Sequence, residues 1–283
     1  STFDSVLATA PTQALFGTDL MVQTFTASGT WIKPSNGRTA TIEGISAAGS
    51  GARSSLGNGS GGGPGCWFSI TVPLSSLGAT EPVTIGAGGA VQATDNTNGN
   101  NGGTTSFGTH LVLYGGRGGT QGILGTAQSG GGSGTFWDMW SAGYPNSAGY
   151  LIGQTSLTAG SAANFNQANE KCAAATGVTA ANLVTTIGLQ ALFGGAGGAG
   201  HAAALASGAQ NTSIKAGNGG AGNQAGAGGN GASPGGGGGS GTTQGGSGGN
   251  GQLTITVNYL LTRDLGVPEA ANDNTPMWLS AAA

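Results

Sequence analysis

Few residues in this chain are of types that do chemistry, and their spacing matches no known metal site. The two histidines are His110 and His201, and the two cysteines are Cys66 and Cys172. Zinc ligands usually come in pairs a few residues apart, and none of these four has such a neighbour. We therefore expect no metal, with His110 on a strand face and His201 after a tight turn. The cysteines should be small buried side chains, although a bridge between them stays open.

Two glycine-containing motifs have the sequence patterns of a cofactor site and of a catalytic serine. Residues 195–200 (GAGGAG) have the spacing of a dinucleotide fingerprint, but no acidic residue occurs from 202 to 262 to bind a ribose. The pattern Gly-x-Ser-x-Gly occurs around Ser233 and Ser247, inside a glycine tract rather than between a strand and a helix. Chance matching in a glycine-rich chain explains both motifs, so we expect no cofactor and no catalytic serine.

One group of acids and aromatics has the residue types of a glycan-cleaving site. Asp138 lies between Trp137 and Trp140, and Glu170 follows later in the same segment. Glycosidases need two carboxylates about 5 to 10 Å apart, which this pair supplies only if the fold brings it together. We expect a protein that is not an enzyme and keep a glycan-depolymerising enzyme as the alternative.

The elements that would position these residues are predicted to be β-strands, because apolar and polar residues alternate along them. The expected strands lie within 23–33, with a turn at Ser28-Gly29, and at 39–45, 66–74, 82–85, 107–114 and 252–259. Ile42 and Glu43 should face opposite sides of their strand, and Pro73 should mark an edge or a strand end. The strand aromatics expected in the core are Trp31, Trp67 and Phe68. The fold class predicted is all-β, a small antiparallel β-sandwich-like core.

Three regions depart from this pattern. Residues 1–22 and 260–283 are expected to be terminal arms on either side of a glycine-rich β domain at 23–259. Residues 136–193 are interpreted as a partly helical insertion, because they contain Ala-rich stretches that tolerate a helix. Those stretches are residues 161–175 and 179–192.

Large apolar residues gather in two of these regions and are the candidate contact residues. The insertion opens with Phe136, Trp137, Trp140, Tyr144 and Tyr150. They can form a local core or subunit contact, or they can offer flat surfaces to sugar rings or to a partner protein. The C-terminal arm carries Met277, Trp278 and Leu279. Exposed apolar residues are costly on a free monomer, so we expect this arm to dock on a neighbouring subunit.

Glycine dominates the composition, with 62 Gly but only 9 Pro among 283 residues. Much of 194–251 repeats glycine every three residues, which is the pitch of a polyproline-II helix. Such a helix has no internal hydrogen bonds, so it persists in a fold only by bonding to neighbouring segments. Collagen is excluded because Pro is scarce and because the three-residue glycine repeat is interrupted and restarts at a different position. We predict packed, polyglycine-II-like segments, and a flexible linker is the alternative. We also predict an oligomer, because association of chains offsets the entropy cost of ordering glycine.

The charge pattern excludes several kinds of partner. Lysine and arginine number only 7, are scattered singly, and leave a formal net charge of −3. Nucleic acids are bound by clustered basic residues, so we expect no nucleic-acid partner. No stretch approaches 18 consecutive apolar residues, so we expect no membrane insertion.

Four stretches, taken together, resemble the glycine-rich domain found in many bacteriophage tail-fibre and adhesin-like proteins. They are FTASGTWIKP at 25–34, VPLSSLGATEPVTIGAGG at 72–89, GGTTSFG at 102–108, and a glycine tract that ends in GNGQLTITV at 249–257. The match runs over 24–119 and 194–259, and the insertion and both termini depart from it.

The resemblance implies a structural virion protein of a tailed phage, placed in a tail fibre, tail tip or spike rather than in the head. It also implies a homotrimer that binds other virion proteins and meets a host cell-surface glycan or outer-membrane protein through loops carried by packed polyglycine-II helices. A capsid decoration protein shares this composition and is a further alternative.

Overall fold

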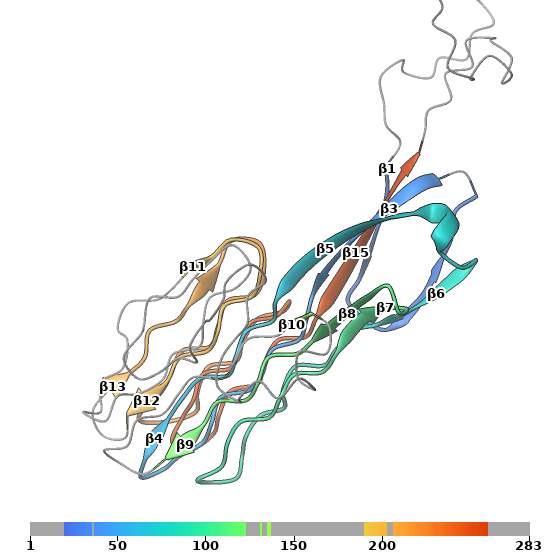
Figure 1. Cartoon of the computed structure of the whole chain (residues 1–283). Helices are drawn as coiled ribbons and strands as arrows, with labels where there is room; N and C mark the ends of the chain where they lie inside the picture. Colours follow the sequence, from blue (N-terminus) through green and yellow to red (C-terminus); the bar gives the residue numbers. More distant parts are fainter. Residues whose placement is uncertain are drawn as a thin grey trace, which may run out of the picture.

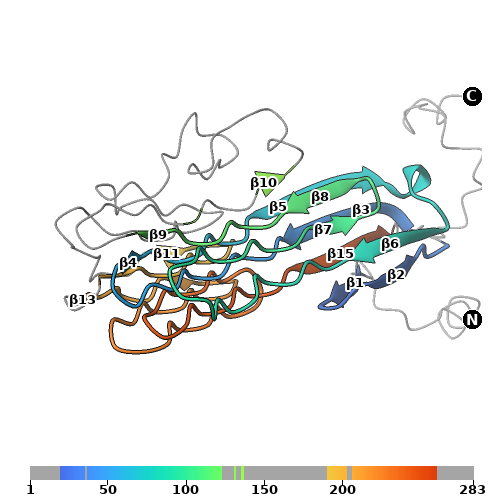
Figure 2. The ribbon, with the colours of Figure 1, turned by 90° about the horizontal axis from the view of Figure 1, so that it is seen from below.

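The computed structural model describes residues 20–35, 37–122, 131, 135–136, 190–202 and 206–259, and these residues form an elongated all-β body. Two β-sheets occupy one end, and long glycine-rich segments leave the sheets and fill the other end (Figures 1 and 2). The predicted fold class is therefore confirmed. None of the residues described here belongs to a helix of the length and apolar character that crossing a membrane requires.

The first sheet is antiparallel and has the order β1-β15-β3-β5. Its strands are β1 (Leu20–Phe25), β15 (Gln252–Tyr259), β3 (Gly37–Ile45) and β5 (Trp67–Pro73). Alternation places Ile42 in the interior and Glu43 on the outer face, as predicted. Pro73 is the last residue of an edge strand, where its missing N–H breaks no ladder. Residues 20–22, assigned to the N-terminal arm, belong to β1.

The second sheet has the order β10-β8-β7-β6-β2. Its strands are β10 (Thr135–Phe136), β8 (Leu111–Tyr114), β7 (Thr105–Phe107), β6 (Thr80–Thr84) and β2 (Gly29–Ile32). The single strand predicted at 107–114 is wrong: it is two strands joined by a tight turn. Gly108 lies at φ 49°, a conformation that glycine adopts without strain, and the His110 amide closes the turn on the Phe107 carbonyl.

The apolar core lies between these two sheets. Ile42 and Ile255 come from the first sheet, and Phe107 and Leu113 come from the second. Trp31 of β2 is fully buried and meets Phe107 edge-to-face, with 5.5 Å between ring centroids. A short 3-10 helix, η1 (Leu74–Ser76), adds Leu74 to the same core. The predictions for Trp31 and Phe68 are confirmed.

Trp67 is the exception, because its prediction as a core residue is wrong. It pairs with Ile45, which lies three residues after the buried Ile42 on β3. Because side chains alternate between the two faces of a strand, Ile45 and Trp67 face outward from the first sheet. There its ring stacks on Phe193, with centroids 4.8 Å apart.

Two small sheets lie among the glycine-rich segments. One contains β13 (Ala206–Ser207), β12 (His201–Ala202), β4 (Asn58–Gly59) and β9 (Gln121–Gly122), and the other pairs β11 (Gln190–Ala191) with β14 (Thr212–Ser213) in parallel. The helix predicted at 179–192 is therefore wrong at its end. The carbonyls of Ala191 and Leu192 accept from the amides of Ile214 and Lys215 instead of closing a helical turn. The rest of that stretch, and 161–175, lie outside the described residues.

The glycine-rich segments continue the hydrogen-bonded strands of the sheets without a break. Beyond the last β3–β5 pair, Ser46, Gly49 and Ala52 donate backbone hydrogen bonds to Cys66, Gly63 and Ser60. The bonds now recur every third residue instead of every second. The same two chain segments thus pass from β pairing into a three-residue period.

The segment Gly235–Gly241 shows the packing most completely. Its amides donate to three neighbouring segments in turn: Gly236 and Gly239 to 229–232, Gly237 and Ser240 to 196–199, and Gly238 and Gly241 to 49–52. Its carbonyls accept from three others: Gly235 and Gly238 from 62–65, Gly236 and Gly239 from 246–249, and Gly237 and Ser240 from 220–223. A helix with three residues per turn and six hydrogen-bonded neighbours is the polyglycine-II arrangement.

Close approach explains why these positions are glycine. A Cβ added at Gly239 would overlap the carbonyl oxygen of Ala221, and one added at Gly238 would overlap that of Gly246. The packing also extends beyond the predicted range of 194–251. Residues 46–66, 86–103 and 115–122 belong to the same glycine lattice, the name used below for all of these packed segments.

Candidate binding surface at the distal turns

The turns at the far end of the glycine lattice form the candidate binding surface. Four of them are described, at residues 54–57, 92–97, 223–226 and 241–244, and we call them the distal turns. The lattice segments run outward from the sheets and return, so these turns lie at the opposite end from β1 (Figure 1). The two ends of the described chain pair with each other in the first sheet, Leu20 with Asn258.

Arg53 links two of the distal turns. Its Nη1 donates to the carbonyl oxygen of Ala93, and its Nε donates to that of Thr242 at 3.4 Å. The same Nε lies 3.7 Å from Oδ1 of Asp95. Because one side chain contacts two distal turns, those turns are held in a fixed relation to each other.

Asp95 joins its own turn, 92–97, to the turn at 54–57 in a similar way. Its Oδ1 accepts from the amides of Ser55, at 2.9 Å, and Asn96, at 2.8 Å, and its Oδ2 accepts from the Ser55 hydroxyl. The Ser55 hydroxyl bond, with the amide bonds and Arg53 adding to it, holds the pKa of the Asp95 carboxyl below its ordinary value. The carboxylate is therefore ionised at neutral pH and occupied in holding these two turns together.

The groups left exposed are mostly uncharged. Leu56 is 80% exposed, and Thr94, Asn96 and Thr243 of the other turns are also exposed. Hydroxyl, amide and apolar groups of this kind suit hydrogen bonding and packing against a sugar or a protein loop. Asp95 is the one acidic residue in the four distal turns, so they offer no pair of carboxylates for glycoside hydrolysis.

The glycine motifs found in the sequence have structural roles. In residues 195–200, Gly195 and Gly198 donate their amides to the carbonyls of Gly65 and Gly62. Those amides are therefore not available to bind a phosphate. The hydroxyl of Ser233 accepts from the Asn250 amide, and the Ser247 amide donates to the side chain of Asn230, as expected of a glycine tract rather than a nucleophile elbow.

The two histidines lie in different surroundings. His110 is in the turn after β7 rather than on a strand face, with Nε2 3.4 Å from Oε1 of Glu81. His201 is fully buried in β12, where its ring contacts Ser240 and the Ser54 carbonyl. Within the described ranges no three His, Cys, Asp or Glu side chains are grouped as a metal site would need.

Cys66 is buried, and its amide donates to the Ser46 hydroxyl. Cys172 lies outside the described residues, so the question of a bridge between them is not tested.

Most of the site residues predicted from the sequence lie outside the described residues. Phe136 is in β10 and pairs with Leu113 of β8. Trp137, Trp140, Tyr144 and Tyr150 of the insertion, its acids Asp138 and Glu170, and Met277, Trp278 and Leu279 of the C-terminal arm are not described. Sequence reasoning missed Arg53 and Asp95, because nothing in the spacing indicates that two turns 40 residues apart meet.

Comparison with known proteins agrees with the glycine-rich character. A family model described as a glycine-rich domain matches residues 23–258. The matched range starts within β1 and ends one residue before the end of β15, so it includes most of both sheets and the glycine lattice. No curated protein matches the chain. The family description names neither a function nor a location.

Proposed function

The chain belongs to the glycine-rich domain family, and we propose that it is a non-enzymatic structural protein of a bacteriophage tail that carries its distal turns toward the host surface. Its partners are then other virion proteins at the sheet end and a host glycan or outer-membrane protein at the distal end. The motifs at 25–34, 72–89 and 102–108, which resemble tail-fibre and adhesin-like proteins, support this setting.

One structural observation carries the proposal: a backbone-bonded lattice holds polar turns at the end remote from the paired chain ends. Each segment of the lattice is fixed by hydrogen bonds to several neighbours, as Gly235–Gly241 shows. Several side chains in the turns, such as Leu56, Thr94 and Thr243, are exposed, and they suit recognition because the scaffold beneath them is held by these bonds.

The open sheet edges support the oligomeric part of the proposal, a homotrimer. β1 and β2 are edge strands of the two sheets, joined by a short turn, and they expose Met21, Val22 and Ile32. Exposed edges with apolar side chains are usually covered by another chain or element.

Two experiments test the proposal. Immunogold labelling of the phage particle that encodes the chain should mark the tail, and label on the head would support a capsid decoration protein instead.

Purified chain should also slow adsorption of that phage to its host. Leu56→Lys and Thr243→Lys should weaken this competition, whereas Ser75→Lys, an exposed change at the sheet end, should leave it intact. Equal competition by all three variants would remove the distal turns from host binding.

A further inference from the structure

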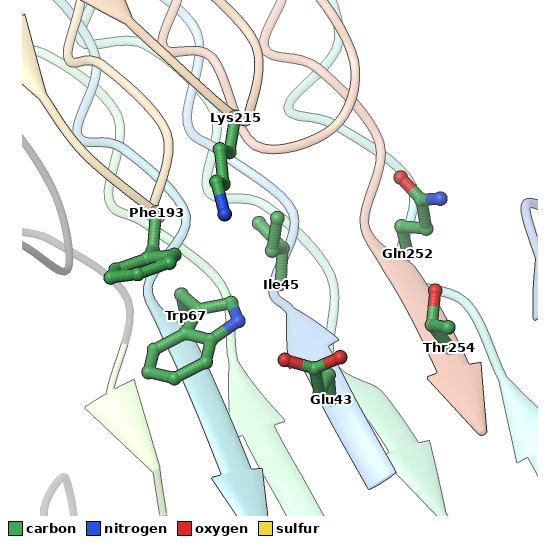
Figure 3. A pocket seen from close by; sticks show the side chains of 7 residues that line it. All are labelled: Glu43, Ile45, Trp67, Phe193, Lys215, Gln252 and Thr254. Atoms are coloured by element: carbon green, nitrogen blue, oxygen red, sulfur yellow. The ribbon is translucent and has the colours of Figure 1, made fainter. Parts of the chain in front are cut away.

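A polar groove lies far from the distal turns, on the outer face of the first sheet where that sheet meets the glycine lattice (Figure 3). Its floor comes from β3, β5 and β15, and its wall comes from Phe193 and Lys215, which flank the β11–β14 pair. The side chains that line it are Glu43, Ile45, Trp67, Phe193, Lys215, Gln252 and Thr254. The groove holds a volume of about 240 Å³.

The aromatic part of the groove is preorganised. Trp67 and Phe193 stack with their ring planes 25° apart, and the Lys215 ammonium lies 4.9 Å from the centroid of Phe193. Stacking and cation–π attraction fix these three side chains before any ligand arrives. Preorganisation of this kind lowers the entropy cost of binding.

The polar part of the groove has unused hydrogen-bonding capacity. Among the described residues, neither the Glu43 carboxylate nor the Lys215 ammonium has a hydrogen bond or an ion pair, although both line the same groove (Figure 3). Gln252 adds an amide, which both donates and accepts, and the indole Nε1–H of Trp67 adds a donor. Both donors and acceptors thus line one small space beside an aromatic pair.

We propose that this groove binds one ring of an uncharged carbohydrate. A sugar ring has an apolar face for the aromatic pair and several hydroxyls, each of which both donates and accepts. Known ligand pockets of drug size hold about 300–1,000 Å³, so the smaller volume here suits a single ring. One negative and one positive side chain line the groove, so neither an acidic nor an amino sugar gains net attraction.

The groove is independent of the proposed function. It uses residues of β3, β5, β15 and the segment around β14, none of which belongs to a distal turn. A substitution in the groove can therefore abolish sugar binding there without affecting host binding at the distal turns, and the reverse also holds.

Saturation-transfer NMR on the full chain tests this inference. The probes are glucose, galactose and N-acetylglucosamine, with sialic acid, glucosamine and glycine as charged or zwitterionic comparisons. We expect saturation transfer to at least one neutral sugar and weaker transfer to the charged probes. Glu43→Gln and Lys215→Met should each weaken binding about tenfold, because the first removes the charge from an acceptor and the second removes a charged donor.

Thr41→Val is the matched control, because Thr41 lies on the same outer face and bonds Thr71 rather than lining the groove. It should bind the sugar as wild type does, and thermal melting should show that all three variants fold. No transfer to any neutral sugar, preference for a charged or zwitterionic probe, or equal binding by Glu43→Gln and Thr41→Val would each overturn the inference.

Discussion

Among single residues, His201 shows how the glycine lattice accommodates a buried polar ring. Its Nε2 lies 3.1 Å from the carbonyl oxygen of Ser54, which only accepts, so Nε2 carries a hydrogen. Its Nδ1 lies 2.8 Å from the hydroxyl of Ser240, which can donate to a neutral ring. Desolvation by burial lowers the pKa of His201, outweighing the hydrogen bond to Ser54 that raises it. The ring is therefore neutral at pH 7.

This burial predicts a loss of stability in mild acid. The unfolded chain has a His201 pKa of about 6.5, and the folded value lies below it, so the unfolded state binds more protons as the pH falls. The free energy of unfolding should be level above about pH 6.5 and should fall below it. Urea unfolding between pH 7.5 and 5 measures this slope.

His201→Gln should flatten the slope, because its side chain does not titrate. Ser75→Gln is the control: Ser75 is exposed at the sheet end and does not titrate, so the variant should keep the slope of wild type. A slope that survives unchanged in His201→Gln would assign the acid sensitivity to other groups. Asp95, whose pKa is lowered from 3.8, contributes only at more acidic pH.

At the scale of elements, the sequence predicts best where one short period governs the segment. In β15, the alternation of apolar and polar residues places Leu253, Ile255 and Val257 on one face, and the structure buries that face. In 194–251, the three-residue glycine period predicted packed polyglycine. Residues 49–65 contain similar lattice segments, but they are too short and mixed for a clear period, and the prediction of packed polyglycine does not include them.

The groove and the distal turns illustrate what a single sequence does not reveal. Trp67 was expected in the core, and only its register against Ile45 shows that it faces outward. Phe193 reaches Trp67 because lattice segments distant in sequence lie side by side. These contacts depend on which segments become neighbours. A three-residue glycine period indicates that a segment packs against other segments, but it does not indicate which ones.

Gly239 tests the lattice at this scale. Gly239→Ala places a Cβ against the carbonyl oxygen of Ala221, in a segment surrounded by backbone on every side. Overpacking of this kind costs about 1–3 kcal/mol, and we expect at least that loss in the free energy of unfolding. Denaturant unfolding measures it.

Gly29→Ala is the matched control, because its new Cβ would lie 3.6 Å from the ring of Phe25, an ordinary contact. It should change stability by no more than about 0.5 kcal/mol. Equal losses in the two variants would contradict close approach as the reason for glycine at position 239.

For the whole molecule, backbone hydrogen bonds replace an apolar interior over the distal half. Hydrogen–deuterium exchange should therefore find the amides of 236–241 strongly protected, because each donates to a neighbouring segment and the segment is buried. The amide of Leu56, at an exposed distal turn, is the internal comparison and should exchange quickly. Exchange of 236–241 at the rate of a free peptide would contradict the packed lattice.

The sheet end gives the last prediction, which concerns assembly. Val22 on β1 is 57% exposed and Ile32 on β2 is 69% exposed, and among the described strands both are edges of their sheets. Since water contact with such side chains is unfavourable and edge strands offer unpaired backbone groups, association of copies through this end should be favourable. Sedimentation equilibrium should give three times the chain mass. Ile32→Lys should shift the mass toward the monomer by placing a charge in the interface, whereas Leu56→Lys, which adds the same charge at a distal turn, should not. A monomeric wild type at micromolar concentration, or dissociation by both variants alike, would refute assembly through these edges.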